Sequence, residues 1–120
     1  MGTWYGTNIR SERHRQATLY ALRILLGENF SPYIQEVYLY GSCARGEEKY
    51  RSDVDLLVKV VPKTPARIMR RMKAEAVPDD CELPEVDVKV TSGGELGSDR
   101  FEKNVEKDRR LLWKKCCGDF

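Results

Sequence analysis

The sequence predicts an α+β domain in which a small mixed sheet is covered by helices mainly on one face. The chain has 120 residues, of which 41% are hydrophobic and 33% charged, as is typical of one globular domain with a modest core. Its hydrophobic patterns follow the order helix, strand, strand, helix, strand, helix. The strand patterns place apolar residues on one face and polar residues on the other, so the helices are expected to pack on a single face.

The first predicted helix begins after Ser11, whose hydroxyl can cap it, and ends near Leu26. Gly27 is a typical residue at the C-terminal end of a helix. A stripe at helical spacing supports this prediction: Thr18, Ala21, Leu22 and Leu25. His14 is the single histidine of the chain and is expected at the surface or at the cap. Residues 1–10 are expected to form a loosely ordered N-terminal arm.

Three segments alternate between apolar and polar residues with the period of a strand: 36–40, 53–60 and 85–91. The core-facing residues of the second strand are Val54, Leu56, Val58 and Val60. Asp53 and Asp55 lie on its other face, because side chains two apart on a strand point to the same side. The sheet is therefore expected to have one buried face and one polar face.

A second helix is predicted between the second and third strands, with Thr64 as its cap, Pro65 at its first position and its end near Ala76. Its inward stripe consists of Ile68, Met69, Met72 and Ala76. Its outer face is basic and consists of Arg67, Arg70, Arg71 and Lys73. This face is either a solvated surface or a contact surface for an acidic partner or a nucleotide.

A last helix is predicted after a glycine-rich stretch, with Ser98 or Asp99 as its cap and its end near Lys115. Residues 116–120 are expected to form a frayed C-terminal tail. The folded domain is therefore expected to span residues 11–115.

Charge and composition exclude several classes of protein. Basic and acidic residues number 21 and 19, and the net charge of +2 gives no strong signal for nucleic-acid binding. The chain has no apolar run of transmembrane length, and its first residues lack the pattern of a secretory signal, so a cytoplasmic protein is expected. The cysteines lack paired metal-ligand spacings and are expected to be free thiols: Cys43, Cys81, Cys116 and Cys117.

A Gly-Ser pair and two aspartates flank the turn between the first two strands. Gly41 lets the backbone turn sharply and approach a ligand closely. Ser42 offers a hydroxyl where backbone N–H groups can point at an anion. Asp53 and Asp55 present two carboxylates on the same side of the next strand. Because Mg²⁺ usually binds one or two carboxylates together with substrate phosphates, this arrangement predicts a site for a metal-bound phosphate.

A third carboxylate joins this pair if the three strands are neighbours, because Asp87 lies on the polar face of the third strand. Three uncompensated carboxylates in contact would raise one another's pKa, and a divalent cation removes that cost. Arg45 and Lys89 are candidates for contacts with phosphates, although each could instead pair with a local carboxylate.

The sequence resembles a known enzyme family along almost all of its length, from Ser11 to Trp113. Gly41-Ser42, ten intervening residues and Asp53-x-Asp55 are similar to the signature of nucleotidyltransferases of the DNA polymerase beta superfamily. The Ala44-Arg45-Gly46 segment and the Ser52-Asp53-Val54-Asp55-Leu56 context resemble the minimal nucleotidyltransferases, or MntA-like antitoxins. The resemblance implies a polymerase-beta-like nucleotidyltransferase fold.

The resemblance also implies roles for the site residues. Asp53 and Asp55 would bind one or two Mg²⁺ ions, and Asp87 would complete the metal site and is a candidate for the base. Gly41 and Ser42 would hold the triphosphate of ATP. An acceptor hydroxyl would attack the α-phosphate, and pyrophosphate would leave. No nucleophilic side chain is required, so Cys43, although it lies inside the motif, is not a catalytic candidate.

Relatives of this kind imply a particular partner and acceptor. Minimal nucleotidyltransferases are typically paired with a small helical HEPN-type toxin, to which they transfer AMP from ATP, on a tyrosine. The sequence is therefore interpreted as a protein adenylyltransferase (AMPylation) of a toxin–antitoxin system, whose acceptor site comes largely from a partner or a second subunit. Two alternatives stay open, nucleotidyl transfer to a small molecule such as an aminoglycoside and a non-catalytic binding subunit. The sequence also leaves open a homo-oligomer.

Overall fold

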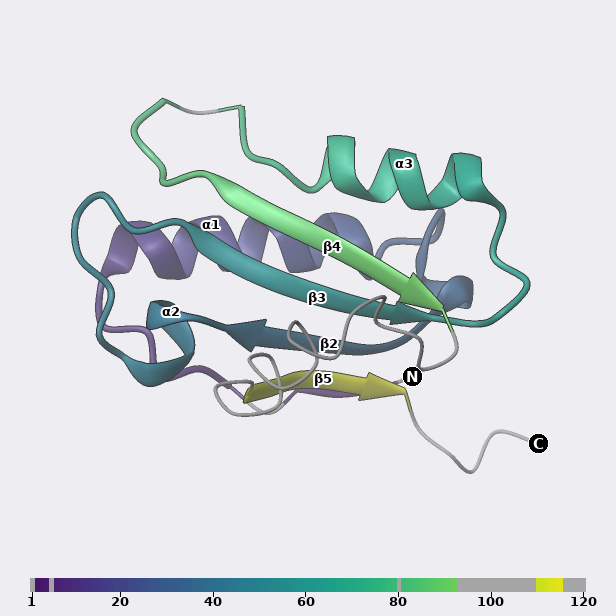
Figure 1. The fold of residues 1–120 in the computed structure, drawn as a ribbon, viewed down its shortest axis with the longest axis horizontal. Coiled ribbons are helices and arrows are strands. Elements are labelled where there is room, and N and C mark those ends of the chain that lie inside the picture. The colour runs from purple at the N-terminus through teal and green to yellow at the C-terminus, as the bar shows by residue number, and fades with distance from the viewer. Residues whose placement is uncertain (1, 5, 80, 93–109, 116–120) are drawn as a thin grey trace.

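The computed structural model describes residues 2–4, 6–79, 81–92 and 110–115, and one mixed sheet dominates them (Figure 1). Its strands are β1 (Gly2–Trp4), β2 (Ile34–Tyr40), β3 (Val54–Val60), β4 (Val86–Ser92) and β5 (Arg110–Lys115). They lie in the order β1-β5-β2-β3-β4. Strands β3 and β4 are parallel, and the other neighbours are antiparallel. The prediction of a small mixed sheet is therefore confirmed.

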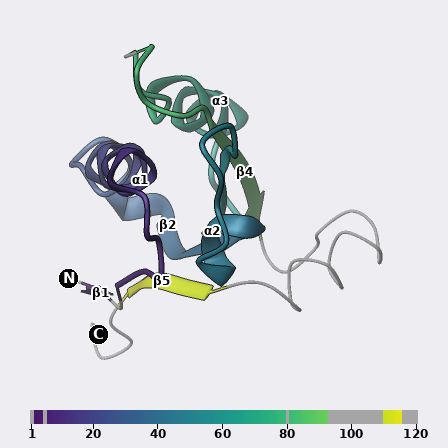
Figure 2. The ribbon, with the colours of Figure 1, turned by 90° about the vertical axis from the view of Figure 1, so that its left-hand side faces the viewer.

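The two longer helices pack on the same side of this sheet, as predicted (Figure 2). The helical elements are α1 (Glu12–Leu25), α2 (Ser42–Arg45), α3 (Ala66–Glu75) and a short 3₁₀ turn, η1 (Ser31–Tyr33). Helix α1 contacts both α3 and the sheet. Among the described helices, none combines the length and the apolar character needed to cross a membrane.

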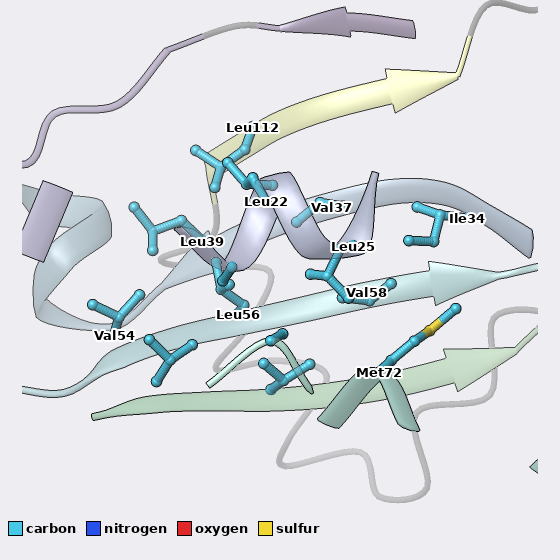
Figure 3. Packing of buried hydrophobic residues seen from close by; sticks show 14 of the residues in the cluster. Leu22, Leu25, Ile34, Val37, Leu39, Val54, Leu56, Val58, Met72 and Leu112 are labelled. Carbon is cyan, nitrogen blue, oxygen red and sulfur yellow. The ribbon is translucent and has the colours of Figure 1, made fainter. Parts of the chain in front are cut away.

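The core lies between these two helices and the sheet (Figure 3). The predicted inner face of β3 is fully buried: Val54, Leu56, Val58 and Val60. The predicted stripe of α1 is buried against it: Thr18, Ala21, Leu22 and Leu25. Helix α3 contributes Ile68 and Met72 to the same core. Burial of these side chains on one face leaves the opposite face of β3 and β4 available for polar residues.

The predicted first helix is confirmed to within a residue at each end. The Ser11 hydroxyl accepts a hydrogen bond from the backbone N–H of His14, as an N-cap residue does. The predicted cap of the second helix is wrong, because the Thr64 hydroxyl donates to the carbonyl of Val61, 2.7 Å away. Pro65 occupies the N-cap position instead, and α3 begins at Ala66.

Two predictions for the chain ends are wrong. Part of the N-terminal arm is ordered as β1, at one edge of the sheet. The segment predicted as the end of the last helix forms β5, which pairs with β2 so that Trp113 lies opposite Val37. Pairing with a distant strand overrides the local helical pattern here. Residues 98–109 and the tail, 116–120, lie outside the described residues, and the domain limits stay a prediction.

The face of the sheet away from the helices is less polar than predicted. Leu57 on β3 and Tyr38 on β2 are buried there, at 1% and 7% exposure, beside Tyr40 and Leu111. Tyr38 and Leu57 are opposite each other in the β2–β3 register. This small apolar cluster lies two residues along β3 from Asp55, so it borders the predicted site.

Candidate active site

The predicted site residues lie at one end of the sheet. Figure 1 shows that β2 ends, α2 forms, and β3 and β4 begin at this end. Helix α2 starts directly after β2, because Gly41 turns the chain out of the strand with φ 76° and ψ −157°. Gly46 ends α2 in the left-handed conformation, and the chain returns to β3 through residues 47–53.

The parallel register of β3 and β4 places two of the carboxylates side by side. Asp55 is directly opposite Asp87, and on the other side of β3 it is opposite Tyr40 of β2. Burial raises the pKa of Asp55 to about 6, and the negative charges of Asp87 and Asp53 add to that shift while Lys89 opposes it. The predicted proximity of Asp55 and Asp87 is therefore present in the structure.

Asp53 lies one residue before β3 and has an exposed side chain. Its charge contributes to the raised pKa of Asp55, so it lies within electrostatic reach of the pair. Within the described residues, however, no three acidic, cysteine or histidine side chains already converge closely enough to form a metal site. The donor chemistry still fits a hard cation, because Mg²⁺ requires only one or two protein carboxylates and completes its coordination with phosphate and water.

Gly41 lies in direct contact with Asp55. A Cβ atom at position 41 would be 2.8 Å from Asp55 Oδ2, which is closer than side chains tolerate. The missing side chain therefore lets the backbone of the Gly-Ser turn approach the carboxylate. Ser42 follows as the first residue of α2, and its carbonyl accepts the N–H of Glu47 at 2.9 Å. The turn and the carboxylates predicted to bind a metal-bound phosphate are thus adjacent.

The two predicted basic residues each pair with a local carboxylate. Arg45 Nε is 2.8 Å from Glu47 Oε1, and both side chains are largely exposed. Lys89 Nζ is 3.6 Å from Asp87 Oδ2, on the same strand. The ammonium of Lys89 therefore partly balances the carboxylate pair, which agrees with its lowering effect on the pKa of Asp55. Contact of either side chain with a nucleotide stays a prediction.

Cys43 is buried behind the site, and its thiol donates to the carbonyl of Asp53, 3.5 Å away. Burial raises the pKa of this thiol to about 12, and the charges of Glu48, Asp55 and Asp53 contribute. A thiol that stays protonated is a poor nucleophile. Cys43→Ser, which keeps a donor for the Asp53 carbonyl, is therefore expected to leave the nucleotidyl transfer rate unchanged and to destabilise the fold by about 1–2 kcal/mol, because it buries a more polar group in the place of the thiol. Steady-state rates and thermal unfolding of the two proteins check this, and a loss of transfer without unfolding would contradict it.

Two residues near the site were not predicted to contribute to it. Tyr40 lies in one row with Asp55 and Asp87, and burial together with these charges raises its pKa above the usual range, so its phenol stays protonated. Its position directly before the Gly-Ser turn was the available signal. His14, expected at the surface or the cap, is fully buried and contacts the cap residue Ser11. His14 lies four residues before Thr18 and so continues the predicted stripe of this helix, which was the available signal for its burial.

Taken together, the mixed sheet, the Gly-Ser turn and the adjacent carboxylates define an enzyme of the polymerase-beta-like nucleotidyltransferase class. A family model of the nucleotidyltransferase domain matches residues 21–112, so the chain belongs to this family and is a nucleotidyltransferase. None of the curated proteins matches the chain.

Solved structures share the fold. A protein from Sulfolobus solfataricus, assigned as a nucleotidyltransferase, superimposes with a TM-score of 0.54 at 22% identity, over 88% of this chain and 90% of that one. Spectinomycin adenyltransferase AAD(9) from Enterococcus faecialis, solved with ATP and spectinomycin, also gives a TM-score of 0.54, at 13% identity over 81% of this chain. The chain spans 48% of the length of the adenyltransferase. At 22% and 13% identity, these two structural similarities support the fold of the chain alone.

Proposed function

We propose that this enzyme is a Mg²⁺-dependent adenylyltransferase that uses ATP. The observation that carries the proposal is the adjacency of Asp55 and Asp87 across β3 and β4, with Gly41 in contact with the Asp55 carboxylate. Two carboxylates beside a glycine turn match the requirements of a cation that carries a triphosphate. Membership in the nucleotidyltransferase family supports the same chemistry.

The chain's own residues have distinct roles in this proposal. Asp53, Asp55 and Asp87 would hold Mg²⁺, which, when bound, supplies charge stabilisation to the phosphates and to the entering and leaving oxygens. The turn at Gly41 leaves room for phosphate oxygens next to the carboxylates. The Tyr40 phenol, protonated at neutral pH, can donate a hydrogen bond in the same row. Asp87, which is more exposed than Asp55, is the candidate for the base that accepts the proton of the acceptor hydroxyl.

We further propose that the acceptor is a tyrosine of a small helical HEPN-type toxin and that this enzyme acts as its antitoxin. The motif that surrounds Gly41 and Asp53 supports this assignment through its resemblance to the minimal nucleotidyltransferases. A second candidate acceptor is a small molecule such as an aminoglycoside. It is favoured by the shared fold with an adenyltransferase that was solved with ATP and spectinomycin.

The test is label transfer from α-phosphate-labelled ATP with Mg²⁺ in a lysate of the source cells, with the wild type beside an Asp53→Asn, Asp55→Asn double variant. We expect one protein band that is labelled by the wild type and not by the variant, and its mass identifies the acceptor. If label appears only in small molecules separated by chromatography, the aminoglycoside-type acceptor replaces the toxin. If neither labelling nor Mg·ATP binding is detected, the catalytic proposal fails and a non-catalytic binding subunit is favoured.

A further inference from the structure

The first turn of α1 holds the loop that delivers Asp53 to the site. The carboxylate of Glu48 in this loop accepts hydrogen bonds from the backbone N–H groups of Arg10 and Ser11, each at 2.7 Å. The Arg13 guanidinium donates to the carbonyl of Tyr50 at 3.2 Å and stacks 4.1 Å from the centre of its ring. The loop between α2 and β3 is therefore attached to the N-terminal end of α1 at several points.

Of these contacts from the start of α1, the one that His14 makes lies nearest to Asp53 along the chain. Its ring is fully buried, with Nε2 2.7 Å from the carbonyl oxygen of Ser52 and Nδ1 2.7 Å from the Ser11 hydroxyl oxygen. Because a carbonyl oxygen only accepts, Nε2 carries the proton and donates it to Ser52. The Ser11 hydroxyl oxygen already accepts the backbone N–H of His14, so its own proton is available to Nδ1. Both ring nitrogens thus have a partner.

The bond from His14 fixes the peptide unit that leads into Asp53. The Ser52 carbonyl and the Asp53 N–H belong to one rigid plane, so holding the carbonyl oxygen also sets the direction of the Asp53 Cα. The next peptide unit is held as well, because the Asp53 carbonyl accepts from the Cys43 thiol at 3.5 Å and Val54 N–H donates to Glu85 at 2.8 Å. Asp53 therefore has an exposed side chain on a backbone that is fixed on both sides.

We propose that His14 is a positioning residue for Asp53, which it orients by holding the Ser52 carbonyl. This inference rests on the proposed role of Asp53 as a metal ligand. An apolar residue could fill the buried space behind the loop, but only a donor at the Nε2 position reaches the Ser52 carbonyl. Residues that orient metal ligands in this indirect way typically change metal affinity about 10–100-fold when they are replaced.

Two substitutions separate the positioning role from simple packing. Glutamine can place its amide N–H₂ where His14 Nε2 lies, whereas the shorter asparagine can replace only the contact of Nδ1. We expect His14→Asn to weaken Mn²⁺ binding about 10-fold or more, and His14→Gln to stay near the wild type. The affinity is measured for Mn²⁺ alone, from the spin-resonance signal of the free ion, so that it does not depend on activity.

Thr18→Val is the matched control. The Thr18 side chain is fully buried, and its hydroxyl donates to the His14 carbonyl at 2.8 Å, so it bonds to its own helix and not to the loop. Its replacement is expected to lower thermal stability while Mn²⁺ affinity stays unchanged. The positioning role is overturned if His14→Asn binds Mn²⁺ like the wild type, if His14→Gln is weakened as much as His14→Asn, or if Thr18→Val is weakened equally.

A second measurement keeps the inference testable if His14→Asn does not fold. Nitrogen NMR of the wild type is expected to show the proton on His14 Nε2 and a coupling across the hydrogen bond to the Ser52 carbonyl carbon. An unprotonated Nε2 or no such coupling would overturn the inference. The wild-type titration separates the two proposals: if the wild type binds no Mn²⁺, the metal site fails and the positioning role fails with it. If the wild type and His14→Asn bind equally, only the positioning role fails.

Discussion

Replacing Asp55 with asparagine is expected to abolish nucleotidyl transfer and, at the same time, to stabilise the metal-free protein above pH 6. Transfer should be lost because Asp55 is a proposed metal ligand and lies between Tyr40 and Asp87 in the strand register. A bound metal supplies several kcal/mol of charge stabilisation in the transition state, so losing a ligand should lower the rate about 10³-fold or more.

The gain in stability follows from the raised pKa of Asp55. Its ordinary value is 3.8, and burial together with the charges of Asp87 and Asp53 raises it to about 6 in the folded protein. A raised pKa means that folding favours the protonated form, so this contribution to stability is present below pH 4 and is lost as the pH rises through about 6. Asparagine cannot ionise, so it avoids this loss. After allowance for solvent screening, the metal-free Asp55→Asn variant should be about 1–3 kcal/mol more stable than the wild type above the pKa of Asp55.

Thermal unfolding of the metal-free proteins between pH 4 and pH 8 measures this effect, with pH values chosen around the pKa of Asp55. The wild type should lose stability relative to Asp55→Asn as the pH rises, and excess Mg²⁺ should restore it in the wild type alone. Asp79→Asn is the control, since it makes the same chemical change at an exposed carboxylate in the loop after α3. Equal pH profiles for wild type and Asp55→Asn would show that neither burial nor the neighbouring carboxylates raise the pKa of Asp55.

Local patterns predicted the part of the site that depends on alternation along one strand. Asp55 and Asp87 could be placed on the polar face of their strands because side chains alternate with a period of two. The two residues are direct neighbours only because β3 and β4 also pair in register. The sequence patterns could not predict this pairing and had to assume it. The structure meets that condition, with Asp55 opposite Asp87.

Contacts between distant segments were the part that local patterns could not predict. Strand β5 pairs with β1 and β2, which both lie far earlier in the chain. Its own sequence, read locally, showed only a helical pattern. His14 continues the buried stripe of α1, but its contact with the Ser52 carbonyl joins residues that are 38 apart in the chain. Helical spacing could identify the core stripe of α1, but it carries no information about which loop covers the first turn of the helix.

Gly41→Ala is expected to lower nucleotidyl transfer about 10²-fold while the protein still folds. An alanine Cβ would lie 2.8 Å from Asp55 Oδ2, so either the turn or the carboxylate must move by several tenths of an ångström to reach an ordinary contact distance of 3.4 Å or more. Misplacement of catalytic groups by about 1 Å can reduce rates about 10²-fold. The backbone at Gly41, with φ 76° and ψ −157°, lies in a region that is almost restricted to glycine, and alanine there costs about 1–3 kcal/mol.

Gly6→Ala separates these two effects, because Gly6 also has a positive φ, of 80°, but a Cβ atom there would meet no atom within 4 Å. Both variants should lose stability, and only Gly41→Ala should lose transfer and Mn²⁺ affinity, since only its new methyl group contacts a proposed metal ligand. Rates, Mn²⁺ titrations and unfolding curves of the two variants provide the comparison. An equal loss of transfer in both would assign the effect to backbone strain, and an active Gly41→Ala enzyme would show that phosphates do not require the close approach of this turn to Asp55.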